Sequence, residues 1–497
     1  MTGRPRAARP NVLFLIAHDI SLRFGCYGDP RAVTPHLDAL AAGGTLFENA
    51  FCQFPLCAPA RTCLMTGCRP DTVQRHENDG TEFYAGMRRR LPWIRTIPEL
   101  LRAGGYRTVS LHKVMHEYDA DPPSWSEPQW HATSGEAPAW CPDDFDCRER
   151  ARRYHSPANR ALMEERFRTL LAAEPDAATQ FKRWRGGPVE RALVADDAYY
   201  AGEATAEAIR VLRAHAADQE AAPLFLGVGF CNTHLPWLAP ERYWRLHDGT
   251  DFGAEAGYDT PRPAPLAAEL AVAGNEPFQY YEQTDHLPGA RAAWQPTTGQ
   301  AEELRRGHYA AVSYVDAQIG RILAALEETG MAQNTVVAFT TDHGFALGEH
   351  RHWGKGVTWE PDLRVPLLLR VPGSTAGQRV TGLTEHVDLM PTLLQLAAVP
   401  VPDWAEGSSL LPLLDDPSAP GKPAVFSQAR RGPLTAYSTR TADHRYTRVL
   451  DASGHVQAEE LYDHGTDPEE TINLVPYAAP SFLARLRSLA LRANRCW

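Results

Sequence analysis

The stretch NVLFLIAHD, residues 11 to 19, joins an apolar run to a histidine and an aspartate. A continuous apolar run of this length is typical of a strand that is buried on both faces, as strands of parallel sheets are. In open α/β sheets, ligands bind beyond the carboxyl ends of the strands. The stretch therefore predicts a buried strand and, at His18 and Asp19, a functional position.

Strand and helix patterns alternate along the rest of the chain. TPHLDALAAGG, residues 34–44, has an N-cap threonine, a proline at the first helical position and two terminal glycines. Further helical patterns span 96–105, 201–218 and 308–330, and further strand patterns span 106–111, 223–230 and 335–342. The alternation predicts an α/β fold with a mixed, mostly parallel sheet covered by helices on both faces.

Domain boundaries are expected near a linker. LLPLLDDPSAPGKP closes a main domain at 1–422, and 423–497 is expected to form a small C-terminal subdomain of antiparallel sheet plus helix. Two regions, 118–190 and 240–300, are rich in Pro, Trp, Asp and Gly without clear periodicity. We interpret them as long functional loops that cover the site.

Composition limits the class of protein. The chain has 497 residues, of which 43% are hydrophobic, and a formal net charge of -11, so it can bury a large core and is a poor partner for nucleic acid or anionic membranes. No stretch approaches the roughly 20 apolar residues that span a bilayer. No export signal is visible, and nine cysteines without CxxC pairs fit reduced thiols. We therefore expect a cytoplasmic enzyme.

Polar groups follow four of the predicted strands. One such residue alone is more often a cap or a hydrogen-bonded loop residue, but four strands that end in this way indicate a site at one sheet edge. The pattern favours a metal site at His18, Asp19, Asp342 and His343, and proton-transfer groups at His116 and His234. Lysine is rare here, with four among 50 Lys plus Arg, yet Lys113 and Lys355 both fall at the predicted site, where an ammonium could hold an oxyanion.

The motif CAPARTCLMTG, from Cys57 to Gly67, resembles the signature of the type I sulfatase family, Cys-x-Pro-x-Arg followed by Thr-Gly. NVLFLIAHD, TDHGFALGEH and VDLMPTLLQLA extend the resemblance over nearly the whole chain, and CYGDP, HKVMH, HLPW and LYDHGTDPEE resemble the iduronate-2-sulfatase branch most. The resemblance implies an alkaline-phosphatase-like fold and hydrolysis of a small anionic sulfate ester. The substrate would be an ester of a sugar or another small alcohol.

The resemblance also implies a role for each candidate residue. A formylglycine-generating enzyme would oxidise Cys57 to formylglycine, whose hydrated gem-diol is the nucleophile. A thiolate would be trapped as a stable adduct, whereas a second hydroxyl can expel sulfate. The implied roles are metal binding by Asp19, Asp342 and His343, anchoring of formylglycine by Arg61, sulfate binding by Lys113 and Lys355, protonation of the leaving alcohol by His234, and deprotonation of the second hydroxyl by His116.

Two positions depart from the family pattern. The family usually has two aspartates after the first strand, where this chain has His18-Asp19, and Ala60 replaces a frequent serine. The resemblance implies Ca²⁺, but two His plus two Asp suit Zn²⁺, Mn²⁺ or Fe²⁺ better. Alternatively, His18 turns away and bonds a neighbour.

Three other functions stay open at this stage. Phosphonate monoester and phosphodiester hydrolases of the same superfamily resemble this chain, and a sulfuryl group could pass to an acceptor other than water. A sulfatase-like binding protein would keep Cys57 unmodified.

Overall fold

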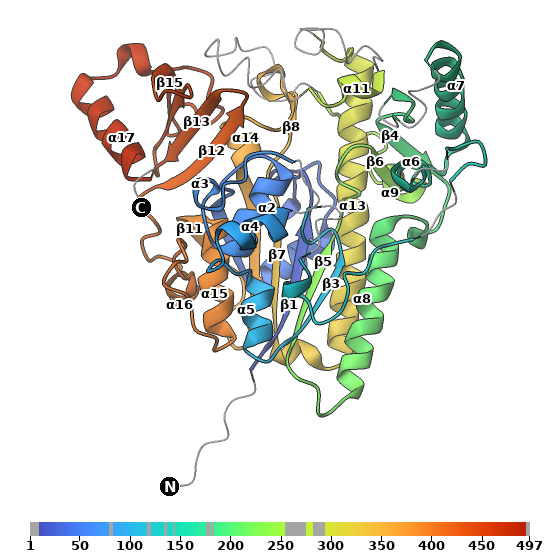
Figure 1. Cartoon of the computed structure of the whole chain (residues 1–497), viewed down its shortest axis with the longest axis horizontal. Helices are drawn as coiled ribbons and strands as arrows, with labels where there is room; N and C mark the ends of the chain where they lie inside the picture. The colour runs from blue at the N-terminus through green and yellow to red at the C-terminus, as the bar shows by residue number, and fades with distance from the viewer. Residues whose placement is uncertain are drawn as a thin grey trace.

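The computed structural model describes residues 9–78, 83–116, 121–133, 137–142, 145–174, 180, 183–253, 275–281 and 294–493 (Figure 1). Its centre is a seven-stranded sheet in the order β11-β2-β10-β7-β1-β5-β3. The β10 strand is antiparallel to both neighbours, and all other pairings are parallel. The strands span Asn11–Ala17 (β1), Thr45–Phe51 (β2), Arg107–His112 (β3), Leu224–Gly229 (β5), Thr335–Thr341 (β7), Arg364–Arg370 (β10) and Gln378–Glu385 (β11).

Helices cover both faces of this sheet, as the sequence predicts. Alternate residues of β1 belong to two separate cores, Leu13 and Leu15 to one and Phe14 and Ile16 to the other. The first core includes α1 (Pro35–Ala42), α8 (Tyr200–Ala217) and α13 (Thr298–Glu328), and the second includes α2 (Cys57–Thr66), α5 (Ile97–Ala103) and α15 (Leu389–Leu396). Burial on both faces explains why β1 is apolar throughout.

The two regions expected to be long loops over the site, 118–190 and 240–300, are here called the roof regions. They contain more regular structure than expected. Within 118–190, α7 spans Pro157–Ala173, and the Ser156 side chain accepts a hydrogen bond from the backbone N–H of Asn159 at its start. The expectation of a long irregular loop there is wrong for this segment. Only Met163, Phe167 and Leu170 of this helix are buried, so its apolar stripe is narrow and its periodicity faint.

Shorter elements complete the main domain. They are α3 (Pro70–Val73), α4 (Phe83–Arg90), α6 (Phe145–Ala151), α9 (Glu241–Arg245), α11 (Phe278–Tyr281), α14 (Glu360–Leu363), α16 (Leu411–Asp415), the strand pair β4 (Val189–Ala192) with β6 (Trp237–Pro240), and the pair β8 (Ala346–Leu347) with β9 (Trp353–Gly354). None of the helices seen in the described ranges has the length and apolarity to cross a bilayer.

The C-terminal part forms the small subdomain expected from the sequence (upper left of Figure 1). Its antiparallel sheet comprises β12 (Val425–Arg431), β13 (Leu434–Arg440), β14 (His444–Leu450) and β15 (Val456–Asp463), followed by α17 (Pro480–Ala493). Ion pairs attach this sheet to the main domain: Glu360 of α14 contacts Arg445 and, at 3.3 Å, Arg440. Arg445 Nε also lies 2.5 Å from Glu470 Oε1.

These ion pairs predict a loss of stability in acid. Burial alone would raise the pKa of Glu360, but Arg445 and Arg440 outweigh it and hold the pKa at about 2. Because the folded pKa lies below the ordinary value, the stabilisation is present above about pH 4.5 and is lost as the pH falls towards 2. We expect the melting temperature to fall over this range, and to fall less steeply in Glu360→Gln. Equal pH slopes in the two proteins would contradict the assignment.

Candidate active site

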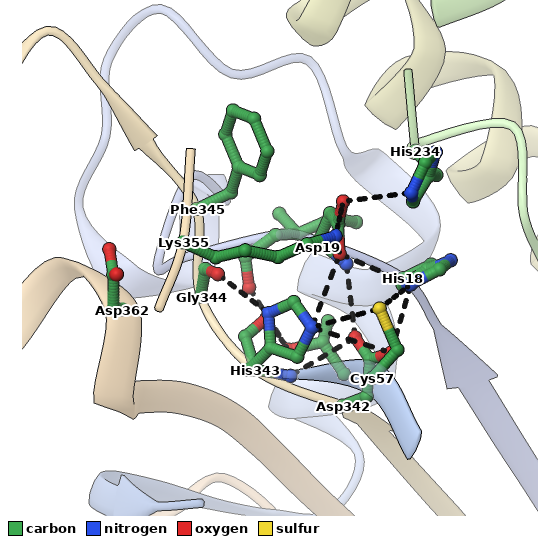
Figure 2. Close-up of polar contacts among 12 residues, drawn as sticks. His18, Asp19, Cys57, His234, Asp342, His343, Gly344, Phe345, Lys355 and Asp362 are labelled. Carbon is green, nitrogen blue, oxygen red and sulfur yellow. Dashed lines mark hydrogen bonds and ion pairs between the residues drawn. The ribbon is translucent and has the colours of Figure 1, made fainter. Parts of the chain in front are cut away.

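Side chains from separate segments meet beyond the carboxyl ends of four strands of the central sheet, after β9, and at the start of α2 (Figure 2). Because parallel strands end at the same edge of the sheet, residues far apart in sequence converge there. The convergent residues are His18 and Asp19 after β1, Lys113 and His116 after β3, His234 after β5, Asp342 and His343 after β7, Lys355 after β9, and Cys57 at the first position of α2.

Cys57 lies at the centre of this group. Its side chain is buried, with 2% of the residue exposed. The Sγ atom lies 2.9 Å from His18 Nε2 and 3.4 Å from His343 Nε2. Burial raises the pKa of the Cys57 thiol, so an unmodified cysteine is held as the weakly nucleophilic thiol.

Asp342 is fixed by hydrogen bonds from three neighbouring groups. Its Oδ1 accepts hydrogen bonds from the backbone N–H groups of Asp19 at 3.1 Å and His343 at 3.0 Å, and its Oδ2 accepts one from Arg61 Nε at 2.9 Å. Burial alone would raise the pKa of Asp342, but His343 and Arg61 outweigh it and hold it well below the usual range. Asp342 is therefore an ionised carboxylate in a dry site.

The Arg61 side chain links the end of β1 with the segments that follow β3 and β7 by hydrogen bonds. Besides Asp342, its guanidinium donates to the backbone carbonyls of Lys113, Val114 (3.0 Å) and Ala17 (3.3 Å). The guanidinium bonds found among the described residues thus go to Asp342 and to backbone, and not to the Cys57 side chain. In this structure the Arg61 guanidinium holds the Asp342 carboxylate. The family resemblance implies instead that Arg61 anchors the formylglycine at position 57.

Asp19 is held by Lys355. The Lys355 ammonium lies 2.8 and 2.6 Å from the two carboxylate oxygens of Asp19. The backbone of Asp19 adopts a positive φ of 54°, an uncommon conformation for a residue with a side chain and one that recurs at functional sites. Burial raises the pKa of Asp19 to about 8 against the opposing effect of Lys355.

The donor set fits a divalent metal. Nδ1 of His343 lies 2.8 Å from the Gly344 carbonyl oxygen, which only accepts hydrogen bonds, so the network assigns the proton to Nδ1. The Nε2 lone pair then faces Asp19 Oδ1 at 3.4 Å and Asp342 Oδ2 at 3.8 Å. A cation between these lone pairs would satisfy all of them, and a histidine N–H on a carbonyl is a usual support for a metal ligand.

His18 faces the same cluster. Its Nε2 lies 3.2 Å from Asp19 Oδ1 and 3.1 Å from Asp342 Oδ2, and the residue is fully buried. The alternative in which the ring turns away from the carboxylates is therefore not what the structure shows. The ligand atoms of His18, Asp19, Cys57, Asp342 and His343 all lie within 4.8 Å of one another.

The remaining predicted residues line a cavity of about 350 Å³ above Cys57. His234 donates from Nδ1 to the Leu235 carbonyl at 2.5 Å, and its Nε2 points to Asp19 Oδ2 at 3.8 Å. Lys113 and His116 lie in the cavity wall. Gly229 ends β5 where an added Cβ would lie 2.0 Å from the Lys113 backbone, so a glycine lets that segment pass closely.

The structure also shows cavity residues that the sequence does not single out. Arg150, Arg153, Arg185 and Glu276 line the cavity from the two roof regions. These residues follow no strand, so the strand-end pattern has no means to select them. The irregular composition of 118–190 and 240–300 was the available signal.

Comparison with known proteins gives consistent results. The sulfatase family model matches residues 10–399, and the model described as N-sulphoglucosamine sulphohydrolase, C-terminal, matches 348–489. Iduronate 2-sulfatase from Mus musculus is 29% identical over 542 residues, covering 93% of this chain and 90% of the relative. Two solved structures share the fold over 98% of this chain. One is a protein in complex with its substrate D-glucosamine-2-N,6-O-disulfate; its TM-score is 0.72, its sequence identity is 21%, and 98% of its own chain is covered. The other is the phosphonate monoester hydrolase of Agrobacterium radiobacter; its TM-score is 0.70, its sequence identity is 24%, and 96% of its own chain is covered.

Proposed function

This chain belongs to the sulfatase family, and from that premise we propose that it hydrolyses a small anionic sulfate ester with a formylglycine made from Cys57. The observation that carries the proposal is the place of Cys57: it lies at the floor of a cavity, next to a carboxylate and imidazole cluster and among cationic side chains. Formation of the aldehyde requires a formylglycine-generating enzyme as a partner.

The covalent steps follow from the chemistry of a hydrated aldehyde. One gem-diol hydroxyl attacks the ester sulfur, and the bond from sulfur to the alcohol oxygen breaks. In this proposal Asp342 takes the attacking proton, and His234, assisted by Lys355, protonates the departing alcohol; the closeness of Asp342 to Cys57 and of His234 and Lys355 to Asp19 supports these roles. His116 then removes the proton of the second hydroxyl, which restores the aldehyde and expels sulfate, so no water attacks sulfur.

Lys113 and Lys355 supply positive charge for the sulfate oxygens. Lys113 is 8% exposed and lies in the cavity wall, and Lys355 is 4% exposed and lies on Asp19. Charged donors fixed in a site with little water stabilise a developing oxyanion without reorganisation. The two ammonium groups and the Arg61 guanidinium outnumber the carboxylates Asp19 and Asp342 even before a metal is counted.

The metal is proposed to lie between His18, Asp19, Asp342 and His343. When bound it would polarise the sulfate group and lower the pKa of the gem-diol. Two imidazole nitrogens among four ligands favour Zn²⁺, Mn²⁺ or Fe²⁺ over Ca²⁺. The orientation of His18 Nε2 towards both carboxylates supports this choice.

Arginines from the roof regions favour a substrate with a second anionic group. Arg150, Arg153 and Arg185 line the same cavity as Cys57, and guanidinium groups bind carboxylates and sulfates through paired N–H donors. We therefore propose an ester of a small sugar or similar alcohol that bears a carboxylate or another sulfate.

Matched esters of one alcohol test the reaction class. We expect matured enzyme to hydrolyse phenyl sulfate with a kcat/KM at least about tenfold above that for phenyl phosphate and for a phenyl phosphonate ester, which corresponds to about 1.4 kcal/mol of transition-state binding. The structural likeness to a phosphonate monoester hydrolase makes the phosphonate ester the relevant competitor. A reversed preference would assign this chain to phosphonate or phosphodiester hydrolysis. Phenol release that requires an added alcohol acceptor, with the sulfuryl group recovered as the sulfate ester of that alcohol, would indicate sulfuryl transfer.

A further inference from the structure

Glu276 lies beside Lys355, the proposed sulfate-binding lysine. Hydrogen bonds to β9, the strand just before Lys355, hold it there. The backbone N–H of Glu276 donates to the carbonyl of Trp353 at 2.9 Å. The adjacent Asn275, fully buried, accepts a hydrogen bond from the Trp353 N–H at 3.1 Å. Because Trp353 lies in β9 just before Lys355, these two bonds set the position of Glu276 relative to Lys355.

The carboxylate of Glu276 points into the cavity. Its Oε1 lies 3.5 Å from Lys355 Nζ, and its side chain is 19% exposed. One of its oxygens lies within 4.8 Å of ligand atoms of both Asp19 and His234. Among the described residues that line the cavity, Glu276 is the acidic one, alongside Lys113 and three arginines.

This position is not suited to a second metal. The Lys355 ammonium contacts both Asp19, at 2.6 Å, and Glu276, so a cationic group already bridges the two carboxylates. A carboxylate here also repels the sulfate that Lys355 would hold, because two like charges at close range in a partly buried site are weakly screened. A group that weakens sulfate binding needs a compensating contact with another part of the ligand.

The alcohol half of the substrate offers that contact. His234, the proposed acid for the leaving oxygen, has a ring nitrogen within 4.8 Å of a Glu276 oxygen. A substituent on the carbon adjacent to the one that bears the ester oxygen therefore comes within reach of Glu276. We propose that Glu276 is a specificity-determining residue that accepts a hydrogen bond from a hydroxyl group on that neighbouring carbon. The inference rests on the proposed function and extends it to the substrate class: the monosulfate of a vicinal diol.

Three esters with one leaving-group skeleton test this proposal. They are 2-hydroxyphenyl sulfate, 2-methoxyphenyl sulfate, which has no donor, and phenyl sulfate. For the wild-type enzyme we expect kcat/KM for the hydroxyl ester to exceed that for the methoxy ester by about 10- to 100-fold, the range for a hydrogen bond to a charged acceptor. In Glu276→Ala the ratio should fall to about 1. Glu276→Gln should give an intermediate ratio, because its amide oxygen still accepts.

The control variant is Glu303→Gln. It removes the same charge as Glu276→Gln does. The Glu303 carboxylate accepts a hydrogen bond from Tyr281, which belongs to the same segment as Glu276, and neither Glu303 nor Tyr281 lines the cavity. The wild-type ratio should persist in this variant. Because the ratio compares substrates on one preparation, a partly unfolded fraction does not affect it.

Each other outcome has a defined meaning. If Glu276→Ala slows all three esters equally and keeps the ratio, Glu276 acts on Lys355 or His234, and the specificity proposal is wrong while the sulfatase function stands. A wild-type ratio near 1 overturns the specificity proposal in the same way. If matured wild-type enzyme cleaves none of the three esters, the proposed function fails first and the specificity proposal fails with it.

Discussion

Cys57→Ala is expected to lower kcat/KM for phenyl sulfate by at least about 10⁴-fold, the scale of loss when an enzyme's nucleophile is removed. Alanine cannot be converted to an aldehyde, so no gem-diol can form beneath the cavity. The fold should tolerate the change, because the side chain becomes smaller and its Sγ bonds the imidazoles of His18 and His343 rather than backbone. Hydrolysis rates and thermal melting of the same preparations measure both effects.

Two measurements make this result specific. Cys26→Ala, which removes a half-buried thiol outside the cavity lining, should keep wild-type activity. In active wild-type protein, the tryptic peptide 32–61 should have the lower mass of an aldehyde at position 57. A thiol mass in fully active protein would show that formylglycine is not the nucleophile. A thiol mass together with inactivity after co-expression with the maturation enzyme would favour a binding protein.

Protein purified without a chelator or a nickel column is expected to contain close to one divalent transition-metal ion per chain. Its removal should lower the rate of ester hydrolysis by about 10²- to 10³-fold or more, because a bound cation contributes several kcal/mol of charge stabilisation. It should also lower the melting temperature, because the ion binds only the folded arrangement of His18, Asp19, Asp342 and His343. Elemental analysis, activity and melting before and after chelation measure these three effects.

His18→Asp is the matched variant for metal identity. It replaces the imidazole by the carboxylate that the family usually has, so the ligand set becomes rich in oxygen and should prefer Ca²⁺. Calcium at full occupancy in the wild-type protein would contradict the transition-metal assignment and leave the sulfatase function intact. Removal of the metal without loss of activity or stability would contradict the site itself.

Much of the fold could be predicted because its central strands are buried on both faces. β1, β3, β5 and β7 are marked by apolar runs, and the helices between them by periodicity and glycine stops. β2, β10 and β11 were not predicted. β2 contains Glu48 and Asn49, and β10 contains Pro366, which lacks an N–H and coincides with a register shift between Val365 and Leu367. Their positions depend on pairing across the sheet.

The site residues that could be predicted from the sequence pattern are those that follow strands. Asp19, His234 and Asp342 directly follow strands or lie in the loop after one, so the sheet geometry alone brings them together. Arg61 was placed by resemblance, and its bond to Asp342 requires the tertiary structure. Glu276 is positioned by hydrogen bonds to β9, far away in sequence, and no local pattern encodes such a contact.

The order of strands in the sheet has a consequence for biosynthesis. β1 lies between β5 and β7, and His343, which covers the Cys57 sulfur, follows it by 286 positions along the chain. At about 5–20 residues per second, a ribosome needs roughly 15–60 s to make that interval. During this time the nascent thiol has no completed sheet to enclose it, whereas in the finished protein it is 2% exposed. If an enzyme modifies Cys57, as proposed, the thiol would be most accessible to it during translation, before His343 is made.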